Sequence, residues 1–295
     1  MSGPVAVLGT GTMGAGMVAS LRRADIDVRM WNRDASKAQA LMSTGAEAFD
    51  DPAEAARGAD VVLTMVLDAD AVTDVVRRAA PAAGTVWLQT STVGIEGADR
   101  TVELARELDL VLVDCPVLGT KEPAEQGKLV MLASGPGEVR NRLGPVLDAL
   151  GGKTLWVGDA GAGSRLKMAA NAWLFMVTAG VAQSIALAQG LGLDPKQFLA
   201  AIEGGPLDTP YAHLKGEMMI DGNFPVSFGL TGAAKDARLI RSALQAAGVS
   251  DRLDAAVLET MEASIEALPD PGAVDLSALI GGLRDAGTDR RRPGG

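Results

Sequence analysis

Residues Pro4–Arg23 read PVAVLGTGTMGAGMVASLRR, an apolar run followed by three closely spaced glycines and then by apolar residues at helical spacing. A strand, a glycine turn and a helix in this order bring the amides of the helix N-terminus close to a pyrophosphate. The bare pattern G-x-G-x-x-G is common, but its place between a strand and a helix favours a dinucleotide-binding Rossmann fold. We therefore expect cofactor contacts from Gly9, Gly11, Thr12, Met13 and Gly14.

The next strand, Asp27–Trp31, ends in Asn32, Arg33 and Asp34, followed by Lys37. An acid at this place would accept a hydrogen bond from the ribose 2′-hydroxyl of NAD, whereas an arginine suits the 2′-phosphate of NADP. Arg33 and Lys37 favour NADP, with Asn32 beside them. NAD stays an alternative, with Asp34 turned toward the ribose.

Further apolar runs in the first half alternate with helical stretches. The predicted strands are Asp60–Val66, Thr85–Gln89, Leu110–Asp114, Lys128–Ala133 and Lys153–Val157. Apolar strands alternating with helices predict a mainly parallel, doubly wound α/β sheet that occupies residues 1–163. Ligands bind such sheets at the carboxyl ends of the strands, so the loop at Val66 and Leu67 and those after Gln89 and Asp114 are the places to search.

Lys167 introduces a strongly apolar helix, because residues 166–193 contain this one cation and no acid. Asn171 follows at spacing i, i+4, which puts both polar side chains on one face of the helix. Taken alone, Lys167 is most simply a residue of the first turns whose ammonium reaches solvent. A buried lysine would instead have a pKa lowered toward neutrality, where it can give and take protons.

The rest of the chain shows helical spacing and no strand pattern. We expect helices at Pro195–Ile202, Thr231–Ala247 and Asp251–Leu268, an all-α domain over residues 164–287, and a disordered polar tail over 288–295. His213 is the one histidine, and no carboxylate is obviously paired with it in the sequence, so we interpret it as a structural or surface residue.

Composition excludes several classes of function. The formal net charge of −10 argues against binding of nucleic acid. One cysteine and one histidine exclude an intramolecular disulfide and the usual metal clusters. The N-terminus has no basic segment of a secretory signal, and polar residues interrupt the long apolar helix, so we expect a cytosolic protein that does not span a membrane. A helix that is apolar on all sides favours a homodimer or homotetramer.

These pieces together resemble the β-hydroxyacid dehydrogenase family, which includes 3-hydroxyisobutyrate dehydrogenase and the glyoxylate/succinic semialdehyde reductases. The resemblance runs from about Val5 to Leu283. Its carriers, in chain order, are residues 9–14 (GTGTMG), 114–119 (DCPVLG), 161–171 (GAGSRLKMAAN), 235–236 (KD) and 275–278 (DLSA). It implies a Rossmann domain, a helical domain joined to it by a long helix, and NAD(P)-dependent interconversion of a short hydroxy acid and its semialdehyde or keto acid, without a metal.

The resemblance also implies residue roles. Lys167 matches the catalytic general acid and base, and Asn171 matches an asparagine that holds substrate beside it. Substrate binding is implied for Leu118, Gly119 and Thr120, and cofactor binding for Thr92 and Lys235. The loop departs from the family, which commonly has serine and two glycines there, and Ala172 stands where a second asparagine is frequent. These departures argue against the substrate acid that the family would suggest by default. The stretch at residues 119–125 (GTKEPAE) is more similar to the glyoxylate and succinic semialdehyde reductases than to the hydroxyisobutyrate enzymes.

Two other functions fit parts of the sequence. An imine reductase shares this architecture, but such enzymes generally replace the lysine that Lys167 matches. A non-catalytic dinucleotide-binding protein would not need Lys167 and Asn171. Turnover of a carbonyl substrate, of a cyclic imine, or of neither separates the three hypotheses.

Overall fold

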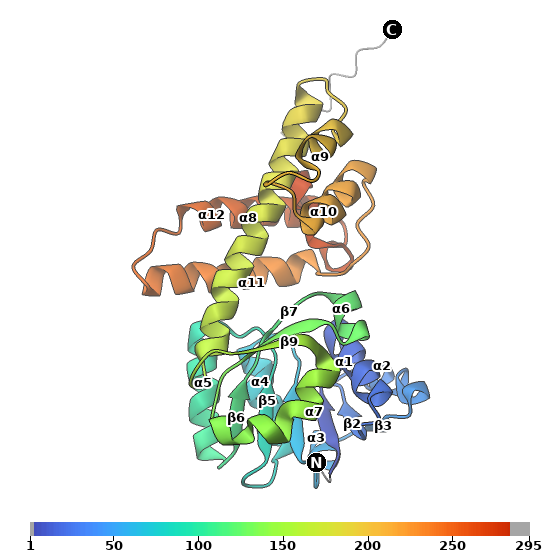
Figure 1. Cartoon of the computed structure of the whole chain (residues 1–295), viewed down its shortest axis with the longest axis vertical. Coiled ribbons are helices and arrows are strands. Elements are labelled where there is room, and N and C mark those ends of the chain that lie inside the picture. Colours follow the sequence, from blue (N-terminus) through green and yellow to red (C-terminus); the bar gives the residue numbers. More distant parts are fainter. Residues whose placement is uncertain (1–2, 284–295) are drawn as a thin grey trace. The chain divides into compact units, whose positions relative to one another are not determined.

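The apolar runs of the first half form a six-stranded parallel sheet in the computed structural model, which describes residues 3–283 (Figure 1). The spatial order is β3-β2-β1-β4-β5-β6, as in dinucleotide-binding sheets. Successive strands are added on one side of β1 up to β3 and on its other side from β4 onward, while all strands stay parallel. The strands are β1 (Val5–Leu8), β2 (Val28–Trp31), β3 (Glu47–Phe49), β4 (Val61–Thr64), β5 (Val86–Gln89) and β6 (Val111–Asp114). The predicted doubly wound α/β fold is confirmed.

Both faces of this sheet are covered, because alternate residues of each strand point to opposite sides. Val5 and Val7 belong to one core with α1 and α7, whereas Ala6 and Leu8 belong to the other with α3, α4 and α5. The helices of this half are α1 (Thr12–Arg23), α2 (Ala35–Gln39), α3 (Pro52–Ala56), α4 (Ala69–Ala79), α5 (Gly94–Glu107), α6 (Lys121–Gln126) and α7 (Arg140–Leu150), with short 3₁₀ turns at Met42–Thr44 and Gly137–Val139.

Two of the predicted strands lie outside this sheet. They form β8 (Leu129–Ala133) and β9 (Gly151–Trp156), which pair in parallel in a separate three-stranded sheet. Its third strand, β7 (Val117–Leu118), runs antiparallel to β8. The prediction of one sheet was therefore wrong for these runs, because an apolar run indicates a strand and does not indicate its partner.

Helix α8 (Ala162–Gly190) carries the chain from the first compact unit, Met1–Met168, into the second, Ala169–Gly295. The predicted functional division after residue 163 stays a prediction, and the predicted tail at 288–295 lies outside the described residues. By length and composition alone α8 could cross a membrane, a test that core helices of soluble proteins also pass.

The second unit is helical, as the spacing predicted. Its further helices are α9 (Lys196–Ile202), α10 (Pro210–Asp221), α11 (Leu230–Ala246) and α12 (Arg252–Ala267), with 3₁₀ segments η3 (Pro271–Ala273) and η4 (Leu276–Leu283). A fully buried ion pair, Lys215 Nζ to Asp275 Oδ1 at 2.6 Å, lies inside it. The same carboxylate accepts hydrogen bonds from Ser227 and Phe228, and so fixes the loop that leads into α11.

Candidate active site

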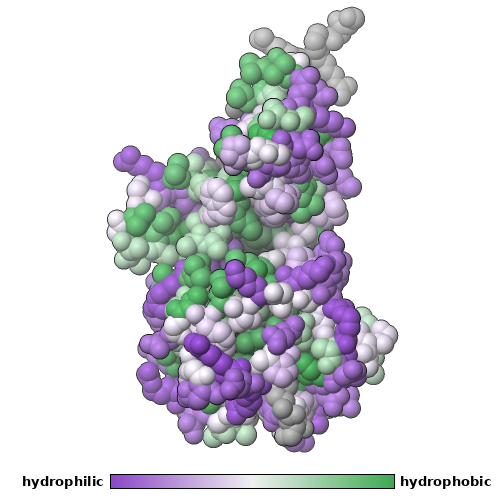
Figure 2. All heavy atoms as spheres, viewed as in Figure 1, coloured by the Kyte–Doolittle hydropathy of each residue, from purple (hydrophilic) through white to green (hydrophobic). Residues whose placement is uncertain are grey.

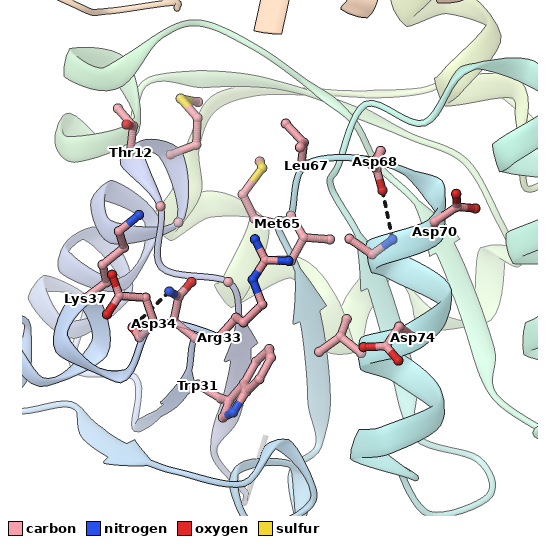
Figure 3. A pocket seen from close by; sticks show the side chains of 18 of the residues that line it. Thr12, Trp31, Arg33, Asp34, Lys37, Met65, Leu67, Asp68, Asp70 and Asp74 are labelled. Carbon is pink, nitrogen blue, oxygen red and sulfur yellow. Dashed lines mark hydrogen bonds between the residues drawn. The ribbon is translucent and has the colours of Figure 1, made fainter. Parts of the chain in front are cut away.

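A cavity in the first unit lies at the carboxyl ends of β1, β2 and β4 and has a volume of about 800 Å³ (Figure 3). It is lined by all the residues predicted to bind the cofactor except Thr92 and Lys235. The volume is within the range of pockets that bind cofactors and other small ligands. That these residues contact a dinucleotide stays a prediction.

The N-terminus of α1 opens onto this cavity without a cap. Gly11 is its N-cap residue and no side chain accepts from the first turn, so backbone amides are left for a ligand. Gly9 has φ +108°, and a Cβ on Gly14 would collide with the Gly9 carbonyl oxygen. These glycines are thus required by a close turn, and the turn fits the phosphates of a dinucleotide.

Charged residues surround the end of the cavity next to β2. Arg33 extends from the end of β2 toward the loop that carries Met65 (Figure 3), and no ion pair involves it within residues 3–283. Asp34 is the N-cap of α2 and accepts from Ser36 N and, at 2.6 Å, from Ser36 Oγ. The Ser36 hydroxyl holds the pKa of Asp34 below its usual value. Asn32 Oδ1 accepts from Thr10 N and so joins the end of β2 to the glycine turn.

Sequence reasoning missed the α4 side of the cavity. Asp70, Asp74 and Arg78 line it from successive turns of this helix. Asp70 pairs with Arg100 and Asp74 with Arg78, so each carboxylate already has a cation. The Arg78 guanidinium also lies over the Trp31 ring, 5.2 Å from its centroid. Spacing i, i+4 was the available signal, but it does not indicate which face of a helix meets a pocket.

The loop after β5 is tied to the loop after β4. Ser91 Oγ accepts from Val66 N at 2.9 Å, and Ser91 N donates to the Gln89 side chain at 2.7 Å. Thr92, the residue predicted to meet the nicotinamide ribose, follows directly and is partly buried. It is not among the residues that line the cavity, and its role stays a prediction.

Lys167 is buried, with 8% of its surface exposed, and Nζ donates to the Val117 carbonyl oxygen at 2.8 Å. The alternative that the side chain reaches solvent is therefore wrong. Val117 begins β7, and Leu118, Gly119 and Thr120 follow it as the predicted substrate loop. Gly119 has φ +126°, and a Cβ there would lie 2.8 Å from a Leu129 methyl carbon, which explains why this position is glycine. The lysine thus holds the start of the loop.

The N-terminus of α8, which carries Lys167, is closed by side chains. Ser134 Oγ accepts from Gly163 N at 2.9 Å, and Asp114 Oδ2 accepts from Ser164 N at 2.8 Å. Ser164 Oγ adds a hydrogen bond to Asp114 Oδ1 at 2.7 Å. Burial raises the pKa of Asp114, and the hydrogen bonds from Ser164 oppose this effect. Gly163 approaches so closely that a Cβ would collide with the Leu132 carbonyl oxygen.

Asn171 is fully buried in the second unit, one helical turn beyond Lys167 on α8. Its Nδ2 donates to Asp236 Oδ2 at 3.0 Å, and Lys235 Nζ lies 2.7 Å from Asp236 Oδ1. Lys235 and Asp236 both belong to α11. The predicted roles of Asn171 in substrate binding and of Lys235 in cofactor binding stay predictions.

The structure also shows the surroundings of His213 and of Cys115. His213 Nε2 lies 2.8 Å from Asp208 Oδ1, so the expectation that it has no carboxylate partner was wrong; Asp208 lies five residues earlier, just before the helix that carries His213. Cys115 is buried, and burial raises the pKa of its thiol. No group of three or more metal-ligating side chains occurs within residues 3–283.

Comparison with known proteins gives matches over both halves. A family model described as the NAD binding domain of 6-phosphogluconate dehydrogenase matches residues 4–158. A second, described as NAD-binding of NADP-dependent 3-hydroxyisobutyrate dehydrogenase, matches residues 161–282.

Individual relatives match nearly the whole chain. Glyoxylate/succinic semialdehyde reductase 2 of Arabidopsis thaliana is 30% identical over 288 residues, covering 96% of this chain and 80% of the relative. A probable 3-hydroxyisobutyrate dehydrogenase of Mycobacterium tuberculosis is 30% identical over 95% of this chain and 97% of its own.

Solved structures show the same architecture. Mycobacterium tuberculosis 3-hydroxyisobutyrate dehydrogenase with L-serine has a TM-score of 0.85 and 26% identity, covering 97% of this chain and 100% of its own. An imine reductase from Pseudomonas, at a TM-score of 0.64 and 19% identity over 96% of this chain and 100% of its own, shares the fold alone.

Proposed function

We propose a specific reaction for this chain, which belongs to the β-hydroxyacid dehydrogenase family and is an NAD(P)-dependent oxidoreductase of that type. The proposed reaction interconverts a short β-hydroxy acid and its semialdehyde or keto acid, with Lys167 as general acid and base. The observation that carries this proposal is the buried ammonium of Lys167, held by the Val117 carbonyl directly before the loop at residues 118–120. A bare surface lysine would not support it.

The chemistry assigned to Lys167 is proton transfer. A bound nicotinamide would supply or take the hydride. In reduction, the Lys167 ammonium gives a proton to the substrate carbonyl oxygen, and in oxidation the neutral amine removes it from the alcohol. The Val117 carbonyl oxygen accepts a hydrogen bond and has no proton to donate. It therefore holds the Lys167 ammonium without competing in the proton transfer.

We infer that the preferred cofactor is NADP. Arg33 lies at the end of β2 without an ion pair among the described residues, and it offers a planar donor fork to a 2′-phosphate. Asp34, the residue that would favour NAD, directs its carboxylate to Ser36. Arg33→Asp should therefore weaken NADPH binding roughly 10- to 100-fold and NADH binding much less, as measured by fluorescence titration. Equal loss for both cofactors would contradict the preference.

The proposed substrate carries a carboxylate that binds the backbone amides around Leu118, Gly119 and Thr120. Residues 119–125 (GTKEPAE) resemble the loop of the glyoxylate and succinic semialdehyde reductases, and a relative in Arabidopsis carries that name, so we infer a substrate of this class. Leu118 adds bulk and removes a hydroxyl where the family commonly has serine. The imine reductase alternative is not favoured, since its representatives share the fold alone.

We propose that the enzyme is a homo-oligomer. Several large apolar side chains of the second unit are exposed in the single chain, and Figure 2 shows hydrophobic residues over its surface. They include Trp173 and Leu187 on α8, at 67% and 60% exposure. Large apolar side chains exposed along one helix indicate a surface that a second copy of the chain would cover. Light scattering of the purified chain measures its mass directly.

The decisive experiment is turnover with NADPH on glyoxylate, succinic semialdehyde, methylmalonate semialdehyde and a cyclic imine. We expect reduction of one or more of the acids and none of the imine. Lys167→Ala should lower kcat about 10²- to 10⁴-fold, as expected for loss of a placed general acid. Lys196→Ala, at the start of α9, is a matched control that should keep the wild-type rate. A near-wild-type rate for Lys167→Ala would assign the proton to another group.

A further inference from the structure

The side-chain amide of Asn171 is held from one side. Its Nδ2 donates to Asp236 Oδ2 at 3.0 Å, and both side chains are buried in the second unit. The carbonyl oxygen of the same amide, Oδ1, is buried and has no hydrogen-bond partner among residues 3–283. One half of the amide is therefore satisfied by the protein, and the other half is not.

The orientation of this amide follows from the chemistry of its partner. An ionised carboxylate has no hydrogen to donate, so it accepts from Nδ2 and repels Oδ1. Lys235 Nζ lies 2.7 Å from the other carboxylate oxygen, so that oxygen also faces a hydrogen-bond donor. The reverse orientation of Asn171 would bring two acceptor oxygens together.

A buried acceptor without a partner costs free energy, and folded proteins leave few of them. Oδ1 of Asn171 is such an atom, on the helix that carries the buried Lys167 one turn earlier. A ligand that supplies an N–H or O–H to Oδ1 removes this cost. A ligand carboxylate placed there would add to it.

We propose that Asp236 is a positioning residue that turns the carbonyl oxygen of Asn171 outward, meaning away from the Asp236 carboxylate. In this orientation Asn171 accepts from a hydrogen-bond donor of the reacting complex and does not bind the substrate carboxylate. The proposal rests on the proposed function, in which Asn171 lies beside the substrate. It leaves the substrate carboxylate to the loop at residues 118–120, and it assigns Asp236 a role that acts through Asn171.

An isosteric substitution inverts the arrangement. In Asp236→Asn, the new amide keeps its oxygen toward Lys235, since an ammonium requires an acceptor, and so turns its NH₂ toward Asn171. The Asn171 side chain must then flip so that its oxygen accepts from this NH₂ group. Its own NH₂ group then points away from residue 236. The hydrogen bond between residues 171 and 236 and the contact with Lys235 both survive, so the thermal midpoint of unfolding should stay close to wild type. The outward atom changes from acceptor to donor, and kcat should fall roughly 10- to 100-fold.

The reciprocal pair tests the polarity. Asn171→Asp alone sets two carboxylates against each other and should lower the unfolding midpoint clearly. Asn171→Asp combined with Asp236→Asn restores a donor facing an acceptor and again presents an oxygen outward. This double variant should recover the midpoint and be at least several-fold more active than Asp236→Asn. Asp221→Asn, an exposed acid at the end of α10, is the control and should change neither quantity.

The two measurements separate the proposals. The unfolding midpoints report the coupling of residues 171 and 236 without any substrate, and NADPH titration checks that Asp236→Asn leaves cofactor affinity within about twofold. A wild type that turns over no acid overturns the proposed function, while the midpoints still decide the orientation. Full activity of Asp236→Asn, or a double variant no more stable than Asn171→Asp, overturns the role of Asp236.

Discussion

Helices α1 and α8 both begin in the first unit, and the backbone amides at their N-termini are treated in opposite ways. The N-terminus of α1 has a glycine at its cap and no side-chain acceptor. The N-terminus of α8 has its amides taken by Ser134 and by the buried carboxylate of Asp114. Both helices have the same partial positive charge at this end.

The difference shows how one structural device serves two purposes. At α1 the amides and the helix dipole are left for an external anion, and the glycines keep side chains out of its way. At α8 the anion is internal, because Asp114 supplies the negative charge from the end of β6. An open N-terminus binds a ligand, whereas a closed one holds its first turns in place, here the turns that carry Lys167.

Closing the space at α1 should give the largest effect. A Cβ on Gly14 would collide with the Gly9 carbonyl oxygen, so Gly14→Ala forces the turn to move. We expect a loss of roughly 3 kcal/mol in the free energy of unfolding, the upper end for an overpacked site, together with loss of NADPH binding. Denaturant unfolding and fluorescence titration measure the two quantities.

Gly11→Ala is the matched control for this effect. Nothing lies within 4 Å of a Cβ built on Gly11, although the residue lines the same cavity. Its stability should stay near wild type while NADPH affinity falls, because the methyl group enters space needed by the ligand. If both variants were equally stable, the close approach at Gly14 would not be a constraint.

The α1 turn could be predicted from the sequence, and the α8 turn could not. The residues that shape α1 lie within one stretch, so their spacing carries the information. Asp114, Ser134 and Ser164 meet across 20 and 50 residues of chain, and hydroxyls and a carboxylate so far apart give no local signal.

Other parts of the structure follow the same rule. Apolar runs predicted the other strands of the six-stranded sheet. Strand β3 (Glu47–Phe49) was not predicted, because it is short and partly exposed. Helix α10 was also missed, since Thr209 and Pro210 suggest a loop as readily as a helix start. In the structure Thr209 is its N-cap and accepts from Ala212 N. The contact of Asn171 with Asp236 joins residues 65 apart and depends on how α8 and α11 pack within the second unit.

Opening the N-terminus of α8 should give an intermediate effect. Asp114→Ala leaves Ser164 N and Oγ without their buried acceptor, which should cost about 1–3 kcal/mol of unfolding free energy. We also expect a lower kcat, because Lys167 lies three residues further along the loosened turn. Unfolding and steady-state kinetics measure these changes.

Asp114→Asn should be much milder than Asp114→Ala. The amide oxygen accepts from Ser164 N and the NH₂ group donates to the Ser164 hydroxyl, while the buried charge disappears. Burial raises the pKa of Asp114, so removing the charge recovers part of the cost of desolvation. An asparagine variant as unstable as the alanine variant would show that the charge, and not the hydrogen bonds, closes this helix.

The N-terminus of α12 gives a third case with a smaller expected effect. Asp254 lies in its first turn, is 2% exposed, and neither carboxylate oxygen has a hydrogen-bond partner among the described residues. Burial, together with the nearby charge of Asp251, raises the pKa of Asp254 to about 6. An acid whose pKa is raised on folding binds protons more tightly in the folded state, so its contribution to stability falls as pH rises from about 4 through about 6.

Asp254→Asn should therefore stabilise the protein at neutral pH. Relative to wild type, we expect a gain of about 1 kcal/mol in the free energy of unfolding at pH 8, because part of the charge is screened by solvent. The gain should shrink as pH falls through 6 and vanish below about pH 3, where Asp254 is protonated in both the folded and the unfolded wild type. Urea unfolding at several pH values measures the trend, and a gain independent of pH would show that packing, and not the buried charge, limits this helix.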